Sequence, residues 1–474
     1  MTEVAAIDLG ATSGRVVVGG LHDGALRMET TARFPNTPVR LADGLHWDVA
    51  ALWSAAMRGL GEASRARALT GAAVDSWAVD YALTRGDRLL GLPMHYRDSR
   101  NDAGVAAVHA VVGPAELYRR NGLQHLPFNT VFQLAAERRD GLLDAADGAL
   151  LIPDLFGWWA TGTRATERTN ASTTGLLQVG GDGWDDALLE RLGLPGLLPP
   201  IVDPGHDLGA LLPAVGDEFG VADGLRFTTV GSHDTASAVV GVPLQHDAAA
   251  YISCGTWSLV GTELPRPLAT DEARAAGFTN EGGVDGRTRF LKNVMGLWLL
   301  SESIRAWERV GERQDLPSLL AQAAEAPEDV ATFDANDPRL LHPGDMPARI
   351  EALLTESGAR VPATIPEFVR GVLQSLANAY AATVDDIERL TGNRVDRVNL
   401  VGGGAQNALL CQLTADTTGR PVVAGPIEAT AIGNLLVQLR THGALSGDLE
   451  ALRRVVARSF PPRTYEPRTR SRRG

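Results

Sequence analysis

Short runs of hydrophobic residues, each closed by glycine or a polar residue, dominate the first part of the chain. Such runs are typical of strands, and they predict strands over residues 4–9, 15–21, 26–34, 71–75 and 78–83. Residues 49–68 instead place their hydrophobic side chains at helical spacing, and this predicts one helix between the strands. This order differs from the strict strand–helix alternation of a dinucleotide-binding fold.

The order of elements is repeated in the second half of the chain. Strands are predicted over 249–253 and 259–263 around a glycine and hydroxyl turn, and this resembles the pattern at the N-terminus. Residues 103–150 are predicted to be helical, and further elements are predicted over 297–309, 366–390, 395–401, 407–417, 422–424 and 429–440, the last being the final helix. We therefore predict an N-terminal domain over 1–241, a C-terminal domain over 242–460 and a basic tail over 461–474.

Composition narrows the classes of function. A chain of 474 residues is long enough for two or three domains. Its net charge of −13 argues against a broad surface for nucleic acid, and we expect the basic tail to be solvated. Two cysteines without CxxC spacing exclude a cysteine-based zinc site and suit a reducing compartment. Because neither a signal peptide nor a long apolar run is visible, we expect a cytoplasmic protein without a membrane partner.

The turn after the first strand carries the first candidate chemistry. Residues 10–14 combine two glycines with the hydroxyls of Thr12 and Ser13, and Asp8 closes the strand before them. Backbone N–H groups and hydroxyls in such a turn can bind an anion. A carboxylate beside a phosphate could hold a metal ion. The alternative is an ordinary hairpin with a polar turn.

Two further glycine-bearing turns offer the same chemistry. Three consecutive glycines, 402–404, join a predicted strand to a helix, whose N-terminus presents free N–H groups to a phosphate. The stretch 255–258 combines Gly255 with the hydroxyls of Thr256 and Ser258. A tight strand-to-helix turn and a plain hairpin are the respective alternatives.

A candidate general base lies near the predicted domain boundary. Asp234 begins a helix-like stretch after Gly231-Ser232-His233. An aspartate in that position is most often an N-cap, yet a carboxylate near a cleft can accept a proton from a substrate hydroxyl. The adjoining serine and histidine do not form a hydrolase triad, because triad side chains converge from different directions. Polar residues gather around 75–81 and 96–100, and they suit a polyol or a solvated loop.

Together these motifs resemble the FGGY carbohydrate kinases of the actin-like ATPase superfamily. The resemblance runs in family order over nearly the whole chain, and the segments that carry it include AAIDLGATSGR (5–15), DSWAVDY (75–81), AYISCGTWSLVGTE (250–263) and NLVGGGAQN (399–407). Its more specific motifs are GSHDTAS (231–237) and the series NEGG (280–283), LKN (291–293) and GLWLL (296–300). It implies an α/β fold of two actin-like, ribonuclease H-like ATPase domains with a catalytic cleft between them. It also implies ATP and Mg²⁺ as cofactors and a small-molecule sugar as substrate, in a monomer or homodimer.

The resemblance assigns roles to individual residues. It implies that Asp234 is the catalytic base and that Asp8 positions Mg²⁺. The ATP-contacting positions that it implies are Ala11, Thr12, Ser13, Gly14, Arg15, Thr256, Ser301 and Gly403. The sugar-contacting positions that it implies are Ala78, His233, Asp234, Thr235 and Asn293.

Two of these positions depart from the family pattern. Ala78 stands where a glycine contacts the sugar through its backbone, and Ser301 stands where a glutamine approaches ATP, so that contact is expected to be lost. Within the family the chain most resembles the members that phosphorylate L-rhamnulose at O1. The alternatives are a kinase for another ketose, such as L-fuculose or a pentulose, and an actin-like ATPase that acts as a chaperone or filament without a sugar substrate.

Overall fold

The computed structural model describes residues 2–139, 141–194, 196–244 and 248–468. The chain forms two compact units, and each is assembled from separate stretches. The first unit comprises Met1–Gln245, Glu263–Phe290 and Ala429–Ser459, and the second comprises His246–Thr262, Leu291–Glu428 and Phe460–Gly474. The predicted domain boundary near 242–248 stays a prediction, since residues 245–247 lie outside the described ones.

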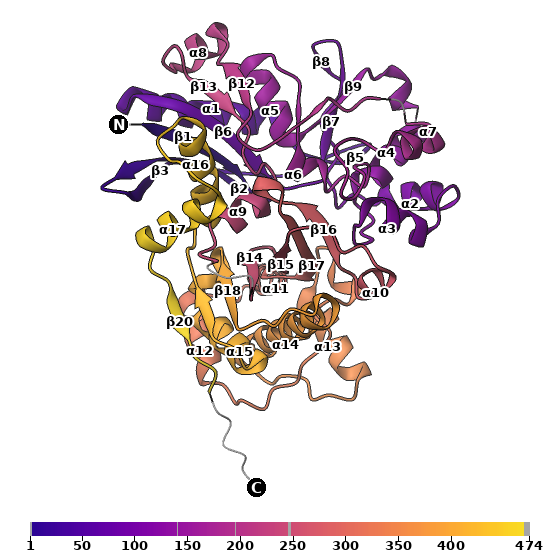
Figure 1. The fold of residues 1–474 in the computed structure, drawn as a ribbon. Helices are drawn as coiled ribbons and strands as arrows, with labels where there is room; N and C mark the ends of the chain where they lie inside the picture. Colours follow the sequence, from indigo (N-terminus) through magenta and orange to yellow (C-terminus); the bar gives the residue numbers. More distant parts are fainter. Residues whose placement is uncertain (1, 140, 195, 245–247, 469–474) are drawn as a thin grey trace. The chain divides into compact units, whose positions relative to one another are not determined.

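A six-stranded sheet forms the centre of the first unit, with the order β12-β13-β6-β1-β2-β3 (Figure 1). Its strands are β1 (Glu3–Leu9), β2 (Ser13–His22), β3 (Ala25–Pro35), β6 (Leu69–Ser76), β12 (Asp207–Ala210) and β13 (Arg226–Thr228). The first three strands are antiparallel neighbours, whereas β6 runs parallel to β1. The hydrophobic runs at the N-terminus therefore form a buried hairpin, as their pattern predicts.

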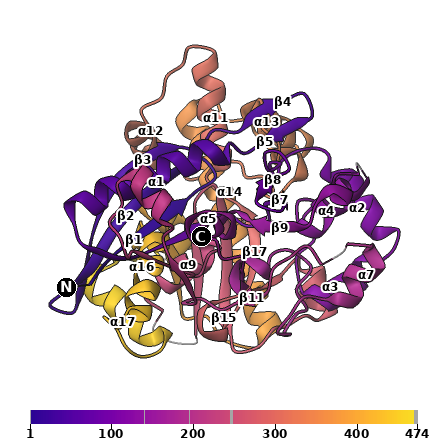
Figure 2. The ribbon, with the colours of Figure 1, turned by 90° about the horizontal axis from the view of Figure 1, so that it is seen from above.

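Helices cover both faces of this sheet. Helix α1 (Val49–Ala66) begins at Asp48, whose side chain accepts from the N–H of Ala51, and buries its apolar face against one side. Helix α16 (Ala429–Thr441) covers the other side, where a Cβ atom on Gly19 would lie 2.7 Å from Leu435. Figure 2 shows the two helices on opposite sides of the strands.

Smaller elements complete the first unit. In the described part of 103–150, which is predicted as helical with a break at 140–141, the chain forms three α-helices, one short 3-10 helix and the start of a strand. Residue 140 of the predicted break lies outside the described residues. The remaining elements are β4 (Val39–Leu41), β5 (Gly44–His46), β7 (Tyr81–Arg85), β8 (Arg88–Leu89), α2 (Asn101–His109), α3 (Pro114–Asn121), α4 (Thr130–Arg139), η1 (Leu142–Ala145), β9 (Gly148–Leu151), α5 (Ile152–Thr161), β10 (Thr166–Glu167), α6 (Arg168–Ala171), α7 (Asp186–Leu192), β11 (Ile201–Val202), α8 (Pro213–Phe219), α9 (Asp234–Val240), α10 (Asp271–Ala275), β16 (Thr279–Gly282), η2 (Val284–Gly286) and α17 (Leu449–Ser459).

The second unit is built around a sheet with the order β16-β17-β15-β14-β18-β19-β20. The boundary between the two units falls inside two strands of this sheet, β15 and β17. The second unit's own elements are β14 (Ala249–Cys254), β15 (Trp257–Leu264), β17 (Thr288–Met295), β18 (Arg397–Val401), β19 (Val422–Ala424), β20 (Arg463–Tyr465), α11 (Trp298–Arg309), α12 (Leu316–Glu325), η3 (Pro338–Leu340), α13 (Met346–Glu356), α14 (Ile365–Thr391), η4 (Gly403–Gln406) and α15 (Ala408–Thr418). As in the first unit, the first strand of a hairpin also has a parallel neighbour. Strand β14 pairs with β15 as an antiparallel hairpin and with β18 in parallel.

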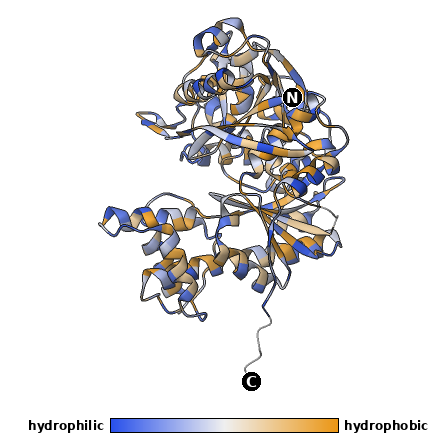
Figure 3. Cartoon of the chain, turned by 90° about the vertical axis from the view of Figure 1, so that its left-hand side faces the viewer, coloured by the Kyte–Doolittle hydropathy of each residue, from blue (hydrophilic) through white to orange (hydrophobic). Residues whose placement is uncertain are grey.

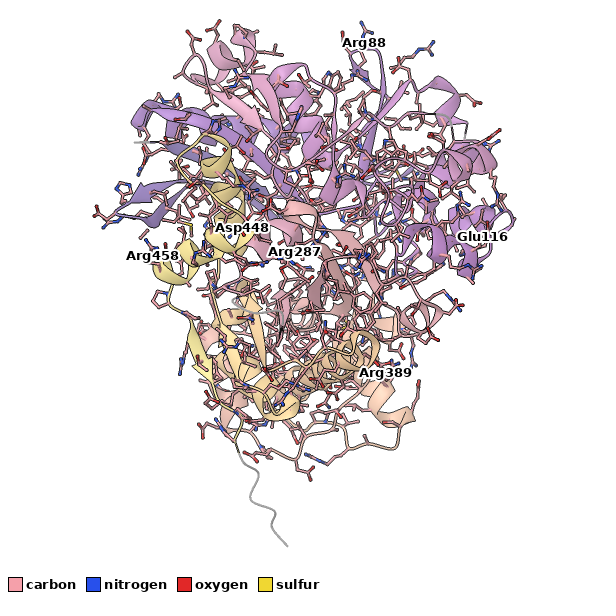
Figure 4. The ribbon with its side chains drawn as sticks, viewed as in Figure 1. Arg88, Glu116, Arg287, Arg389, Asp448 and Arg458 are labelled. Atoms are coloured by element: carbon pink, nitrogen blue, oxygen red, sulfur yellow. The ribbon has the colours of Figure 1, made fainter. Side chains whose placement is uncertain are left out.

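The C-terminal part of the chain differs from its prediction. The final helix is α17 rather than 429–440, and Arg458 near its end donates to the carbonyl of Gly24 at 3.2 Å (Figure 4). Residues 463–465 of the predicted tail form β20, which pairs with β19. Helix α17 alternates hydrophobic and charged residues, and both kinds are interleaved along the helices in Figure 3. In the described residues, no helix combines the length and hydrophobicity needed to cross a membrane.

Candidate functional site

The turn between β1 and β2 is held in place by Asn36. Its side-chain amide donates to the carbonyl of Gly10 at 2.8 Å, and its backbone N–H donates to the carbonyl of Thr12 at 3.0 Å. Thr12 and Ser13 are exposed, so their hydroxyls face solvent, as an anion-binding turn requires. Gly14 is buried, and a Cβ atom there would lie 2.2 Å from the ring of Phe34. Packing alone therefore accounts for this glycine.

Two acidic side chains, Asp8 and Asp75, and the guanidinium group of Arg15 lie together at the end of β1. Two guanidinium N–H groups of Arg15, directly across the hairpin, donate to Asp8 at 2.6 and 2.8 Å. Asp75 is the parallel partner of Asp8 on β6 and is fully buried. Burial, followed by the neighbouring Asp8 carboxylate, raises the pKa of Asp75 well above its ordinary range, and Asp234 raises it further.

A buried series of amides supports Asp75 from α16. Asn434 donates to one oxygen of Asp75 at 2.5 Å, and Gln438 donates to Asn434 at 2.7 Å and to the carbonyl of Ala5 at 2.9 Å. The other oxygen of Asp75 has no hydrogen-bond partner among the described residues. From the sequence alone, Asp75 belongs to the polar segment 75–81 and has no predicted role of its own.

The predicted base and its neighbours lie at the start of α9, beside the end of β6. Ser76 of β6 forms an isolated parallel β-bridge with His233. The N–H of Ser76 donates to the carbonyl of Ser232 at 2.9 Å. His233 is the N-cap, so Asp234 is the first residue of the helix rather than its cap. The Asp234 side chain is about one-third exposed, and its Oδ1 lies 3.0 Å from the hydroxyl of Thr235. A partly exposed carboxylate can accept a proton from a bound hydroxyl.

Glu167 anchors the segment that leads to Asp234. This fully buried carboxylate accepts from the N–H and the hydroxyl of Ser232 at 3.0 and 2.6 Å. It also accepts from Thr169, whose hydroxyl in turn accepts from the N–H of His233. Burial raises the pKa of Glu167 even though these donors favour its charged form. No motif or hydrophobic pattern in the sequence points to a role for Glu167.

Two buried charges lie behind His233. Nη2 of Arg289 is 3.1 Å from Nδ1 of His233 and 3.1 Å from Oε2 of Glu281. The Nε2 atom of His233 lies 3.4 Å from Oδ1 of Asp234. Burial acts to raise the pKa of Glu281, but the opposing charge of Arg289 outweighs it and holds this pKa below its usual value.

Ala78 lies in a turn, not in the strand predicted over 78–83. Val79 has a φ of +69°, which is strained for a β-branched residue, and β7 begins only at Tyr81. Asp80 braces the turn because it accepts from the indole N–H groups of Trp47 and Trp77 at 2.6 and 3.0 Å. In the neighbouring segment 96–100, Arg100 pairs with Glu137 at 2.7 Å, so this polar side chain has a structural partner.

Asp80 makes the stability of the first unit depend on pH. Burial raises the pKa of Asp80 from 3.8 to about 6. The folded state therefore binds the Asp80 proton more tightly than the unfolded state, and protonation of Asp80 stabilises the fold. This stabilisation is complete below pH 3.8 and is lost as the pH rises through 6. Because asparagine does not titrate, Asp80→Asn should gain about 2 kcal/mol relative to the wild type between pH 4 and 7. Urea unfolding followed by tryptophan fluorescence at several pH values tests this, and parallel stability curves for the two proteins would contradict it.

In the second unit, the turn between β14 and β15 is supported by the start of α11. The N–H groups of Leu297 and Trp298 donate to the carbonyls of Gly255 and Thr256 at 2.9 and 3.2 Å. Thr256 is half-buried, whereas the Ser258 hydroxyl is fully buried and 2.6 Å from the hydroxyl of Tyr380. Ser258 therefore does not offer its hydroxyl to a ligand. Ser301 is exposed one turn into α11.

The three consecutive glycines have different surroundings. A Cβ atom on Gly404 would lie 2.3 Å from the sulfur of Cys254, and one on Gly402 would lie 2.9 Å from the Cys254 carbonyl. Gly402 also has a φ of +81°, which favours glycine. Gly403 is exposed, and its Cβ position meets nothing within 4 Å. The fold thus explains two of the glycines and leaves one face of the turn open at the third.

Asn293, the last of the predicted sugar contacts, lies outside the cavity of the first unit. Asn293 lies on β17 and is half-buried. A cavity of about 590 Å³ opens in the first unit, and Asn280, Glu281 and Gly282 are part of its wall. None of the predicted sugar-contacting residues lines this cavity.

Comparison with known proteins identifies the class. Models of the N-terminal and C-terminal domains of the FGGY family of carbohydrate kinases match residues 4–241 and 250–442. The chain therefore belongs to the FGGY family of carbohydrate kinases. It is an enzyme, a carbohydrate kinase, and takes ATP and a sugar.

Individual relatives are similar over almost their whole length. The chain is 41% identical to the rhamnulokinase of Pectobacterium carotovorum over 476 aligned residues, which cover 99% of this chain and 94% of that protein. It is also 41% identical to the rhamnulokinase of Klebsiella pneumoniae over 98% of this chain and 94% of the relative.

Solved structures agree in fold. A ligand-bound xylulose kinase from Lactobacillus acidophilus has a TM-score of 0.81 at 16% identity and covers 99% of this chain and 94% of its own. The Plasmodium falciparum glycerol kinase with ADP has a TM-score of 0.76 at 14% identity, with the same coverage. The two-domain α/β fold is thereby confirmed.

Proposed function

We propose that this enzyme transfers the γ-phosphoryl group of ATP to O1 of L-rhamnulose. The observation that carries this proposal is the 41% identity to enzymes named rhamnulokinase along almost the entire chain. The first unit supports it with a partly exposed carboxylate, Asp234, beside the buried imidazole of His233. Polar side chains of this kind suit a sugar rather than an apolar ligand.

In the proposed step, Asp234 accepts the proton of the sugar hydroxyl. The hydroxyl oxygen then forms a bond to the γ-phosphorus, while the bond from that phosphorus to the β–γ bridging oxygen breaks. ADP leaves with the electron pair of that bond. General base catalysis of this kind contributes about 10² to 10⁴ in rate. His233 and Thr235, next to Asp234, hold the sugar together with the backbone at Ala78 and the side chain of Asn293.

The nucleotide is proposed to be held mainly by backbone and hydroxyl donors. In the first unit, residues 11–15 are the proposed phosphate contacts. In the second unit, the proposed contacts are Thr256 for a phosphate and the open face at Gly403 for the nucleoside. Ser301 is exposed but too short to replace a glutamine in contact with ATP. Phosphoryl transfer depends mostly on alignment and charge neutralisation, which fixed donors supply without rearrangement.

The acidic residues fit a magnesium ion that arrives with ATP. Mg²⁺ keeps several waters and binds through one or two carboxylates together with substrate phosphates. Asp8 and the unpartnered oxygen of Asp75 offer such a small donor set. In the described residues there is no group of three acidic, histidine or cysteine side chains that could hold a metal without the nucleotide. When bound, Mg²⁺ neutralises charge on the β- and γ-phosphates.

Replacement of Asp8 should raise the magnesium requirement of the enzyme. We propose that Asp8 positions the ion through a bound water, so that Asp8→Ala should increase the Mg²⁺ concentration for half-maximal activity by about 10- to 100-fold. The measurement is a Mg²⁺ titration at saturating ATP and sugar, with unfolding temperature as a control because Arg15 loses its partner. A titration curve that coincides with that of the wild type would exclude Asp8 from the metal site.

A panel of ketoses tests the proposed substrate. L-rhamnulose, L-fuculose and several pentuloses are supplied separately with ATP, and ADP release is measured for the wild type and Asp234→Asn. The highest kcat/KM is expected for L-rhamnulose. A higher value for another ketose would replace the substrate, and ADP release that is independent of sugar would favour an actin-like ATPase.

A further inference from the structure

A buried cluster of charge lies behind Asp234, and only His233 among its members has a role in the chemistry described so far. His233, at the N-cap of α9, lies against Glu281 on β16 and Arg289 on β17. The side chain of Arg289 is completely buried, and that of Glu281 is 7% exposed. A buried arginine is costly unless a carboxylate and other acceptors compensate it. Glu281 and the carbonyl of Gly282, which accepts from Nε of Arg289 at 2.8 Å, supply that compensation.

The position of Arg289 decides where His233 carries its proton. A guanidinium group has only donors and does not lose its proton in proteins. The N–H at Nη2 of Arg289 reaches Nδ1 of His233 at 3.1 Å, so Nδ1 is the acceptor. A neutral imidazole with an accepting Nδ1 has its proton on Nε2. Glu281 Oε2 is 3.3 Å from the same Nδ1, but the lone pair of that nitrogen already receives the guanidinium N–H.

The other side of the ring faces the proposed base. Nε2 of His233 lies 3.4 Å from Oδ1 of Asp234. A proton on Nε2 attracts this carboxylate and can also be donated to a sugar hydroxyl. A lone pair on Nε2 would instead repel the carboxylate and change its orientation.

We infer that Arg289 and Glu281 are positioning residues that hold His233 as the Nε2–H tautomer and so orient Asp234 toward the acceptor sugar. This inference rests on the proposed function in its use of Asp234 as the base. Arg289 acts by donating to Nδ1, and Glu281 acts by compensating the buried charge of Arg289. Neither residue contacts the sugar in this scheme.

The tautomer can be observed without substrate. In protein labelled with ¹⁵N-histidine, two-bond correlations between ring nitrogens and carbons distinguish an Nε2–H from an Nδ1–H imidazole. The chain has 10 histidines, and the signals that disappear in His233→Gln identify His233. The Nε2–H pattern is expected in the wild type, and the Nδ1–H pattern there would overturn the inference.

Arg289→Met should reverse the tautomer. Without the guanidinium group, Nδ1–H of His233 can donate to Glu281, which lies 3.3 Å away. If the uncompensated Glu281 prevents folding, the double variant Glu281→Met/Arg289→Met removes both charges, and replacement of a buried pair by apolar residues is often tolerated. His233 in the double variant should show a mixture of both tautomers. The Nε2–H form alone, in either variant, would mean that Arg289 does not set the tautomer.

Steady-state kinetics separate positioning from a merely structural role. Arg289→Met should lower kcat about 10- to 100-fold with little change in the KM for ATP, less than the 10⁴-fold loss known for a catalytic histidine in the wrong tautomer. Arg287→Met is the matched control, because Arg287 is two residues away (Figure 4) and one-third exposed, and it forms a 3.8 Å ion pair with Glu450. It should leave both the tautomer and kcat unchanged.

The outcomes distinguish this inference from the proposed function. If no ketose is phosphorylated, the proposed function fails, whereas the tautomer of His233 is still read by NMR. If the kinase is active and Arg289→Met reverses the tautomer with kcat unchanged, the inference is wrong and the proposed function stands. A reversed tautomer with a lowered kcat supports both.

Discussion

Asp234→Asn is expected to lower kcat by about 10² to 10⁴ while ATP and sugar still bind. The amide keeps the size and polarity of the side chain but cannot accept the proton of the sugar hydroxyl. Asp234 is the first residue of α9, and the loss of its charge near the helix N-terminus should cost at most about 1 kcal/mol of stability. Stopped assays of ADP formation give kcat, and calorimetric titration with each ligand gives the binding constants.

Asp271→Asn is the matched control for this variant. Asp271 is also the first residue of a short helix, α10, and its side chain is largely exposed. Its replacement changes the same charge at the same helix position, so turnover should be retained. If Asp234→Asn keeps a kcat close to that of the wild type, Asp234 is not the base.

Gly404→Ala is expected to destabilise the second unit and weaken nucleotide binding. Its Cβ atom would lie 2.3 Å from the sulfur and 2.6 Å from the Cβ of the buried Cys254, so the backbone or β14 must move. Overpacking of this kind costs about 1 to 3 kcal/mol. Thermal unfolding with and without ADP measures both effects. Cys254→Ala should recover part of the loss, since it removes the sulfur from the contact.

Gly403→Ala provides the contrast within the same turn. Nothing in the described structure lies within 4 Å of its Cβ position, so the unfolding temperature should stay that of the wild type. If the nucleotide lies against this open face, the methyl group should raise the Kd for ADP about tenfold, or about 1.4 kcal/mol. An unchanged Kd would place the nucleotide elsewhere.

The hairpins could be predicted from the sequence because they are local. The strands on either side of the turns at 10–12 and 255–256 are hydrophobic runs closed by turn residues, and β1, β2, β14 and β15 form where the pattern places them. The same local pattern gave a wrong prediction for Ser258, whose hydroxyl was expected to belong to the anion-binding turn. In the fold it turns inward to Tyr380, 122 residues further along the chain.

The supporting residues of the candidate site could not be predicted from one sequence. Asp75 lies beside Asp8 only because β6 pairs in parallel with β1, and Glu167 reaches Ser232 across 65 positions. Neither Glu281 nor Arg289 is among the residues that the sequence pattern assigns to the site. Their importance depends on long-range packing, which hydrophobic periodicity does not specify.

The return of the chain to its first sheet has a consequence for biosynthesis. The face of the first sheet that carries Gly19 of β2 is covered by α16, and Asp75 of β6 has its amide partner there. Proteins are made from the N-terminus, and domains tend to fold as they emerge. The first strands that leave the ribosome must therefore keep one apolar face uncovered until more than 430 residues have been translated, because α16 begins at Ala429. A fragment that ends at residue 241 would keep that face exposed permanently, so expression of the first family domain alone should yield an aggregation-prone protein.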